Sequence, residues 1–377
     1  MGVPNLLLYS PGLGYINRGL ETFTRELHQT IHEDSRLAVT LFQGRGEDTV
    51  DKGRVVWAPR RTSWLYDILP FNVPRGRRYF VESLFFSLPI VKAAYQQKHP
   101  IIHFSESVPA RVLYHLRERF GGEFTLLFSN GGPIAPQHYM RFDYIQVLNP
   151  AQKEEALDAG YPEDRLFLVP YGLNCGTFDL NDEQVKDRES WGLPEDRTIV
   201  LSVGAINTHH KRMHWLVEEF AELDSSAFFL WMVGQEEGKE TDTVKRKAES
   251  LLEPYAYRYD TVPYRQMPQV YAAADQFALC SVKEGFGRVY IEAMASRLPV
   301  IAHRTANTEW ILGADNPGLI DMTERGALAQ TIQQLAQNTV DSNQLATENK
   351  ERTWAKFDWE ALRSRYVSMY ETISENE

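Results

Sequence analysis

The sequence has few cysteines, no long apolar run and no excess of basic residues. Its two cysteines, Cys175 and Cys280, form no CxxC pair or zinc-like spacing, which excludes a disulfide framework and suits a reducing compartment. The most apolar long stretch, residues 79–95, contains two charged residues and a proline and is too short for a transmembrane helix. The N-terminus lacks the basic segment of a signal peptide. We therefore predict a cytoplasmic protein.

Charge and length narrow the class further. Acidic residues outnumber basic ones by 51 to 40, and the resulting formal charge of -11 argues against a general affinity for nucleic acid. The apolar fraction of 43% is typical of globular proteins. A length of 377 residues exceeds what one hydrophobic core usually serves, so two domains are expected.

Short apolar runs alternate with helical patterns along the whole chain, which predicts parallel sheets covered by helices on both faces. We predict an α/β protein with two doubly wound Rossmann-like domains facing across a cleft. The predicted divisions are an N-terminal domain at 1–172, a linker at 173–197, a C-terminal domain at 198–355 and a last helix at 356–377 that packs back on the N-terminal domain. Strands are expected at 5–9, 38–42, 101–104, 125–128, 144–148 and 166–169, then at 199–203, 228–233, 257–262, 276–280, 300–302 and 318–320.

Ligands of such sheets bind at the carboxyl ends of the strands. Gly12 and Gly14 follow the first strand, where glycines allow a ligand to approach the backbone, although a simple tight turn explains them equally well. The spacing is not the GxGxxG pattern of dinucleotide-binding proteins. In the second half, Lys211 and Arg212 lie between a strand and a helix, where they are either a phosphate site or a solvated basic pair.

The stretch SVKEGFGRVYIEAMASRLPV at 281–300 is the most informative. Glu284 precedes a Gly-Phe-Gly turn, and the following helix presents free N–H groups near Gly287 and Arg288 to a diphosphate. Glu292 lies farther along that helix, where a carboxylate accepts hydrogen bonds from ribose hydroxyls. The alternative is an ordinary strand-turn-helix unit with two surface glutamates.

The chain resembles the retaining glycosyltransferases of family 4, part of the glycosyl transferases group 1, which have the two-domain GT-B fold. The run EGFGRVYIEAMASRLPVIA is similar to the E-x7-E segment of that family, and SVGAINTHHKR, FFLWMVGQ and YRQMPQVYAAADQFALCSVKE occur in the family's order. The resemblance covers nearly all of residues 1–375 and is strongest between Ile199 and Ala302. It implies transfer of a hexosyl group from a nucleotide diphosphate sugar, UDP-sugar above all, to a glycan or lipid-linked acceptor.

The resemblance also implies roles for single residues. Glu292 matches the ribose-binding glutamate, Glu284 the glutamate near the donor sugar, and Lys211 the lysine that clamps the diphosphate. The arginine usual after the preceding strand is Ala205 here, and Arg212, where the family has glycine, is predicted to supply the missing guanidinium. The other residues assigned to the site are Gly12, Gly14, Val262, Gly285, Phe286, Gly287 and Arg288, with Asn130 in place of a first-domain histidine.

The sequence contains no Asp-x-Asp pair for a divalent ion, so a metal-independent diphosphate clamp is expected. A rival pattern, His210, His214 and Glu218 at fourfold spacing, would place metal ligands on one helix face, but two cations lie beside it. From sequence alone, Glu292→Ala should abolish nucleotide binding without changing the melting temperature of the free protein.

Residues 54–78 combine six arginines with Trp57, Trp64, Tyr66 and Phe71. This composition suits a peripheral contact with an anionic membrane, a loop for an anionic acceptor, or a solvated basic face above core aromatics. Two alternative functions also stay open. One is a hydrolysing nucleotide-sugar epimerase, and the other is a non-catalytic protein that binds nucleotide sugars.

Overall fold

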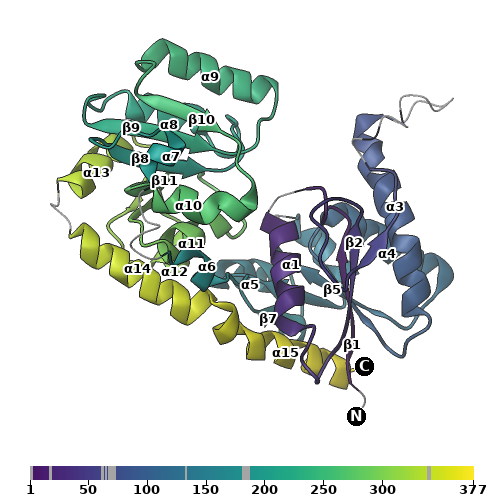
Figure 1. Cartoon of the computed structure of the whole chain (residues 1–377). Coiled ribbons are helices and arrows are strands. Elements are labelled where there is room, and N and C mark those ends of the chain that lie inside the picture. The colour runs from purple at the N-terminus through teal and green to yellow at the C-terminus, as the bar shows by residue number, and fades with distance from the viewer. Residues whose placement is uncertain are drawn as a thin grey trace. The chain divides into compact units, whose positions relative to one another are not determined.

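A computed structural model describes residues 3–16, 19–60, 63, 66, 74–131, 134–180, 187–337 and 341–377. The chain divides into two compact units. Unit 1 comprises Met1–Gly172 and Trp359–Glu377, and unit 2 comprises Leu173–Asp358. Figure 1 gives the element labels used below.

Unit 1 is built on a seven-stranded sheet with the order β3-β2-β1-β4-β5-β6-β7. Every strand pairing in it is parallel. Its strands are β1 (Asn5–Ser10), β2 (Ala38–Gly44), β3 (Arg54–Val56), β4 (Ile101–Phe104), β5 (Thr125–Ser129), β6 (Tyr144–Val147) and β7 (Leu166–Leu168). The sequence missed only β3, a three-residue strand at the sheet edge that shows neither an apolar run nor alternation.

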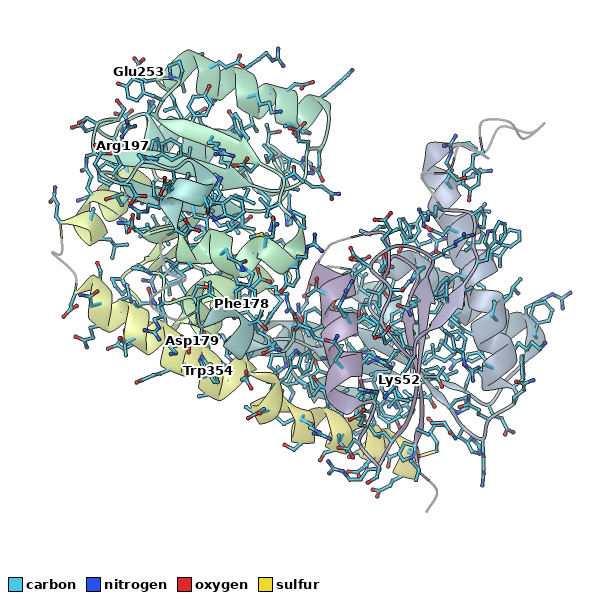
Figure 2. The ribbon with its side chains drawn as sticks, viewed as in Figure 1. Lys52, Phe178, Asp179, Arg197, Glu253 and Trp354 are labelled. Atoms are coloured by element: carbon cyan, nitrogen blue, oxygen red, sulfur yellow. The ribbon has the colours of Figure 1, made fainter. Side chains whose placement is uncertain are left out.

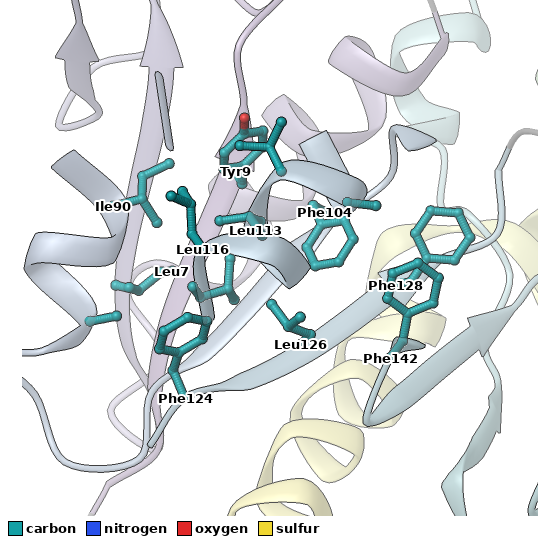
Figure 3. Close-up of a cluster of buried hydrophobic side chains, with 14 of the residues drawn as sticks. Leu7, Tyr9, Ile90, Phe104, Leu113, Leu116, Phe124, Leu126, Phe128 and Phe142 are labelled. Carbon is teal, nitrogen blue, oxygen red and sulfur yellow. The ribbon is translucent and has the colours of Figure 1, made fainter. Parts of the chain in front are cut away.

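Helices cover both faces of this sheet. On one face α3 (Arg75–Ala94), α4 (Ser107–Phe120) and α5 (Pro150–Asp158) bury the apolar cluster drawn in Figure 3. Alternate strand residues such as Leu7, Ile102 and Leu126 point into that cluster, because successive side chains on a strand face opposite ways. On the other face, α1 (Gly19–Ile31) lies against α15 (Trp359–Glu375).

The last helix, α15, is fastened to unit 1 by buried hydroxyl groups. Gln146 Nε2 donates to Tyr366 Oη at 2.8 Å, and Tyr366 Oη donates to the Pro170 carbonyl at 2.9 Å. Tyr370 Oη lies 2.8 Å from His103 Nδ1 in β4. The tyrosine rings on the apolar side of this helix are therefore buried together with their hydroxyl groups, and each hydroxyl group has a hydrogen-bond partner on a strand of the sheet.

Unit 2 repeats the same architecture with the strand order β10-β9-β8-β11-β12-β13, again with parallel pairings. The strands are β8 (Thr198–Val203), β9 (Phe228–Val233), β10 (Tyr257–Asp260), β11 (Gln276–Leu279), β12 (Val300–His303) and β13 (Leu319–Ile320). In both sheets the strand order reverses beside the first strand, between β1 and β4 and between β8 and β11. Two parallel, doubly wound sheets confirm the predicted α/β class.

The helices of unit 2 include two that the sequence missed. The sequence predicts helices at 213–221, 243–252, 267–274, 287–297 and 327–337, and these are α8 (Met213–Phe220), α9 (Lys239–Leu251), α10 (Met267–Ala272), α11 (Arg288–Ala295) and α13 (Ala327–Ala336). The missed ones are α12 (Ala306–Leu312), which is only two turns long, and α14 (Ser342–Phe357), whose polar sequence buries a sparse set of side chains. Residues 173–197, expected as a linker, include the short helices α6 (Cys175–Phe178) and α7 (Arg188–Trp191) and belong to unit 2.

Salt bridges hold the start of unit 2 to its end. Asp179, which follows α6, accepts from Lys350 Nζ of α14 at 2.8 Å and from Arg297 Nη2 at 2.9 Å. Figure 2 labels Phe178 and Asp179 near Trp354 of α14. Helix α6 and Asp179 are therefore packed into unit 2 and do not form a flexible linker.

Candidate functional site

The predicted donor-site residues of unit 2 follow two neighbouring strands. Lys211 and Arg212 lie in the loop after β8, and residues 284–287 lie in the loop after β11. Because β8 and β11 are adjacent at the point where the strand order reverses, both loops emerge at one edge of the sheet. Ligands of doubly wound sheets bind at this position.

Lys211 and Glu284 form a direct ion pair across these loops. Lys211 Nζ lies 2.6 Å from Glu284 Oε1, and the two side chains are only 13% and 8% exposed. The stem of Lys211 runs along Gly204, where a Cβ would lie 3.0 Å from the lysine Cε. Gly204 also has a φ of 152°, so two independent constraints favour glycine at the end of β8.

Asn207 shapes the loop that carries Lys211. Its buried Oδ1 accepts from the backbone N–H groups of His210 and Lys211 at 3.1 and 2.8 Å, and its Nδ2 donates to Glu237 Oε2 at 2.9 Å. Asn207 was not among the residues predicted from the sequence. Asparagine side chains frequently hydrogen-bond the backbone a few residues ahead in a turn, and this preference could have indicated its role.

Arg212 occupies a strained position. It is the N-cap of α8 with a φ of 49° and ψ of 40°, the left-handed conformation that disfavours residues with a Cβ. Its Nη1 contacts the carbonyl oxygens of Cys280 and Met322 at 3.5 and 3.4 Å, and its guanidinium lies 5.1 Å from the centre of the Trp215 ring. The group therefore lies at the carboxyl end of β11 with two long hydrogen bonds.

The Gly285-Phe286-Gly287 turn leads directly into α11. Gly287 has a φ of 85°, and a Cβ there would lie 2.5 Å from the Tyr290 ring, so the turn requires glycine. The N-cap residue of this helix is Gly287 itself, which has no side chain to cap it. Phe286 is buried, and Asn307 Nδ2 donates to its carbonyl at 3.0 Å, which fixes the turn from α12.

Glu292 is buried within a set of donors. Its Oε1 accepts from Arg288 Nε at 3.2 Å and from Tyr264 Oη at 3.1 Å, and its Oε2 accepts from Tyr271 Oη at 2.9 Å. Burial, reinforced by the Glu292 carboxylate, raises the pKa of Tyr271 well above its usual range, so that hydroxyl stays a donor. The two tyrosines lie 21 and 28 residues before Glu292, and no local sequence pattern connects them with it.

This burial overturns one expectation from sequence. Arg288 and Glu292 are 7% and 4% exposed at the side chain, so they form a buried ion pair. Removing one partner of such a pair leaves an uncompensated charge and typically destabilises by about 3–5 kcal/mol. Glu292→Ala would therefore lower the melting temperature of the free protein.

The remaining predicted residues lie on other elements of the two units. Val262 follows β10 at the edge strand of the unit 2 sheet. Asn130 follows β5 in unit 1, where it is 2% exposed and its Nδ2 donates to Tyr139 Oη at 3.1 Å. Its buried Oδ1 has no hydrogen-bond partner among the described residues.

Gly12 and Gly14 follow β1 in unit 1. A Cβ on Gly12 would lie 2.2 Å from Oε1 of Glu21, a buried residue in the first turn of α1, and Gly14 has a φ of 107°. A carboxylate therefore approaches this loop where a phosphate-binding loop would receive an anion. The arrangement suits a ligand that presents hydroxyl groups better than one that presents phosphate.

Two other candidate sites were predicted, a set of metal ligands at His210, His214 and Glu218 and a membrane contact at residues 54–78. Within the described ranges, no three His, Cys, Asp or Glu side chains come close enough to share a metal ion, and Glu218 pairs with Lys247. In the segment 54–78, Trp57 is 61% exposed, whereas Arg61, Trp64 and Phe71 lie outside the described residues. Among the helices that the structure describes, none is long and apolar enough to cross a bilayer.

Known proteins share both the sequence pattern and the fold. Residues 197–338 match the family model described as glycosyl transferases group 1. The lipopolysaccharide core biosynthesis glycosyltransferase LpsE of Rhizobium meliloti is 28% identical over 260 residues, which cover 67% of this chain and 72% of that protein. The predicted resemblance to the group 1 glycosyltransferases is confirmed.

Solved structures agree with this assignment at the level of the fold. The sucrose-phosphate synthase of Thermosynechococcus elongatus matches this glycosyltransferase with a TM-score of 0.79 at 21% identity, over 99% of this chain and 100% of that one. Anabaena HepE, solved in complex with UDP and glucose, matches with a TM-score of 0.75 at 17% identity, over 100% and 99% of the two chains. The predicted GT-B fold, with two Rossmann-like units, is confirmed.

Proposed function

We propose that this glycosyltransferase transfers a hexosyl group from UDP-sugar to a glycan or lipid-linked acceptor, with retention at the anomeric carbon and without a metal ion. Unit 2 is the donor-binding domain in this proposal, and unit 1 is the acceptor side. The observation that carries it is the convergence of Lys211, Arg212 and Glu284 at the edge shared by β8 and β11. The UDP complex of HepE supports the choice of donor.

The proposed mechanism follows from charge. Breaking the glycosyl-phosphate bond makes the anomeric carbon more positive and the leaving diphosphate more negative. Fixed cations and the N–H groups at a helix N-terminus stabilise that diphosphate more in the transition state than in the ground state. Lys211, Arg212 and the amides at Gly287 and Arg288 have this role here, and no side chain is assigned as a nucleophile.

Two carboxylates recognise the hydroxyl groups of the donor in this proposal. Glu292 accepts from the ribose, with its orientation set by Arg288, Tyr264 and Tyr271. Glu284, held by Lys211, accepts from the sugar. The buried Oδ1 of Asn130 is the acceptor that we assign to another sugar hydroxyl, because leaving it unpaired costs about 1–3 kcal/mol.

Three further expectations stay predictions: a cytoplasmic location, a membrane contact through residues 54–78, and contacts of Gly12, Gly14 and Val262 with the ligand. The first experiment is a thermal-shift series with UDP, GDP and ADP. A ligand that binds only the folded protein stabilises it by about 2.7 kcal/mol at 100 times its dissociation constant. Selective stabilisation by UDP supports the donor assignment, whereas no response to any of the three contradicts it.

The matched variant is Glu292→Gln, which keeps the size of the side chain. We expect a lower melting temperature for the unliganded variant, because Arg288 loses its charged partner. We also expect its affinity for UDP to fall at least tenfold. With UDP-sugar and acceptor, the product linkage should keep the anomeric configuration of the donor. Release of UDP with an epimerised free sugar and no acceptor would favour the epimerase instead.

A further inference from the structure

Helix α3 exposes apolar side chains where a surface helix normally exposes polar ones. Successive residues turn by about 100°, so Phe80, Phe85, Leu88 and Tyr95 lie on the side away from the buried residues of the helix, whereas Leu84 packs against the core. Phe80, Phe85, Leu88 and Tyr95 are 44%, 45%, 49% and 51% exposed. This outward side therefore exposes four large apolar side chains along the length of the helix.

The charges on this side are basic. Arg77 and Lys92 are exposed on α3, and the only acidic residue within the helix, Glu82, is buried. Helix α4 packs beside α3 and exposes Arg111 and Arg119 against one acidic residue, Glu118. This local excess of positive charge stands out in a chain whose net charge is -11.

The end of α4 adds an exposed aromatic residue, with the exposed acidic residues Glu118 and Glu123 on either side of it in the sequence. Phe120 is 67% exposed beside Arg119, whose guanidinium carbon lies 6.0 Å from the phenyl ring centre. Tyr95 donates its hydroxyl to the carbonyl of Gly121, which joins the two helix ends. We call the exposed apolar and basic residues of the two helices the α3–α4 surface; its members are Arg77, Phe80, Phe85, Leu88, Lys92, Tyr95, Arg111, Arg119 and Phe120.

We propose that the α3–α4 surface docks on an anionic lipid bilayer, with α3 lying in the plane of the membrane interface. Exposed phenylalanine and leucine side chains bury apolar area among the acyl chains, tyrosine suits the headgroup level, and each basic residue near an anionic surface adds attraction. The proposed contact shares only Arg77 with the one predicted for residues 54–78, because it uses the length of α3 and the end of α4. It is independent of the proposed donor site, which contains none of these residues.

A second copy of the chain fits this surface less well. In a twofold-symmetric dimer the same patch meets itself, so Arg77, Lys92 and Arg119 would face like charges. An anionic bilayer instead supplies the opposite charge and an apolar layer at the same contact.

The test is co-sedimentation of the full-length protein with vesicles of equal parts phosphatidylglycerol and phosphatidylcholine, compared with phosphatidylcholine alone. We expect binding to the anionic vesicles that weakens at least tenfold when salt rises from 0.1 to 0.5 M. F85S/L88S should reduce binding at least tenfold, and R111E/R119E should reduce both binding and its salt dependence. The matched control is L251S/Y255S, which changes side chains of similar exposure, 48% and 56%, in unit 2 and should bind as the wild type does.

Each other outcome overturns the proposal. The proposal is contradicted if the wild-type protein does not bind anionic vesicles, if F85S/L88S binds them as well as the wild type does, or if L251S/Y255S loses binding. Loss of binding in Trp57→Ser with full binding of F85S/L88S assigns the contact to residues 54–78. A concentration-dependent dimer in sedimentation that F85S/L88S dissolves assigns the surface to self-association. The UDP thermal shift of every variant should equal that of the wild type, which separates this test from that of the donor site.

Discussion

Arg212→Gly should make the protein no less stable and much less active. Arg212 caps α8 in the left-handed conformation, with a φ of 49°. That conformation costs a residue with a Cβ roughly 1–2 kcal/mol, a strain that glycine does not have. Glycine loses about 0.5–1 kcal/mol through its more flexible unfolded chain, so the net change in the free energy of unfolding should be about 0 to +1.5 kcal/mol.

The same substitution removes one guanidinium from the proposed diphosphate clamp. Losing one donor to a developing oxyanion typically slows an enzyme by about 10² to 10³, equivalent to about 2.7–4 kcal/mol of transition-state stabilisation. Arg212→Ala should show the same loss of activity without the gain in stability, because it keeps the strained backbone. Urea unfolding and steady-state transfer assays measure the two effects separately.

The chain supplies a matched control in Arg297. It has a φ of 62° just after α11, and its guanidinium pairs with Asp179 rather than pointing toward the strand ends that carry Lys211. Arg297→Gly relieves the same kind of strain and loses a half-exposed ion pair worth about 0–1 kcal/mol. Its activity should equal that of the wild type. Full activity in Arg212→Gly would refute the assignment of Arg212 to the clamp.

Three other substitutions test the local geometry. Gly287→Ala forces a Cβ to within 2.5 Å of the Tyr290 ring at a φ of 85°, so a destabilisation of roughly 1–3 kcal/mol should appear in thermal unfolding. Asn207→Ala frees the loop of Lys211 and should weaken UDP binding in calorimetry by about tenfold, and an unchanged affinity would contradict that role. Burial lowers the pKa of His103 to about 3. Below about pH 6.5 the unfolded chain binds a proton at this histidine and the folded protein does not, so the free energy of unfolding falls as the pH drops from about 6.5 toward 3. His103→Asn should remove about 1.4 kcal/mol of the stability difference between pH 7.5 and 5.5 in urea unfolding, and an unchanged difference would show that His103 is not its source.

The fold was largely predictable because buried parallel strands are continuous apolar runs. Runs such as residues 199–203 and 228–233 became β8 and β9 with nearly the expected bounds. The exceptions lie where burial is partial. The edge strand β3 exposes two of its three residues. Helix α14 buries side chains at every fourth position, but two of these four residues, Asn349 and Thr353, are polar, so neither element shows the apolar pattern on which prediction rests.

The site was predictable in its motif residues but not in their partners. Glycine turns beside charged residues after a strand are visible in a sequence, and they led to Lys211 and Glu284. The tyrosines around Glu292 come from a different segment, and their contact exists only once α10 packs on α11. Likewise the identity of residue 212 is plain from the sequence, but its left-handed backbone requires the folded loop.

The discontinuous make-up of unit 1 has a consequence for how the protein is synthesised. Unit 2 is one uninterrupted segment, whereas the sheet that starts at β1 needs α15 from the other end of the chain to cover His103 and Gln146. At about 5–20 residues per second, the ribosome takes roughly 10–40 s to make the residues that separate β7 from the C-terminus. Unit 1 therefore needs α15, the last helix to be translated, before its fold is complete, whereas all of unit 2 is translated before α15.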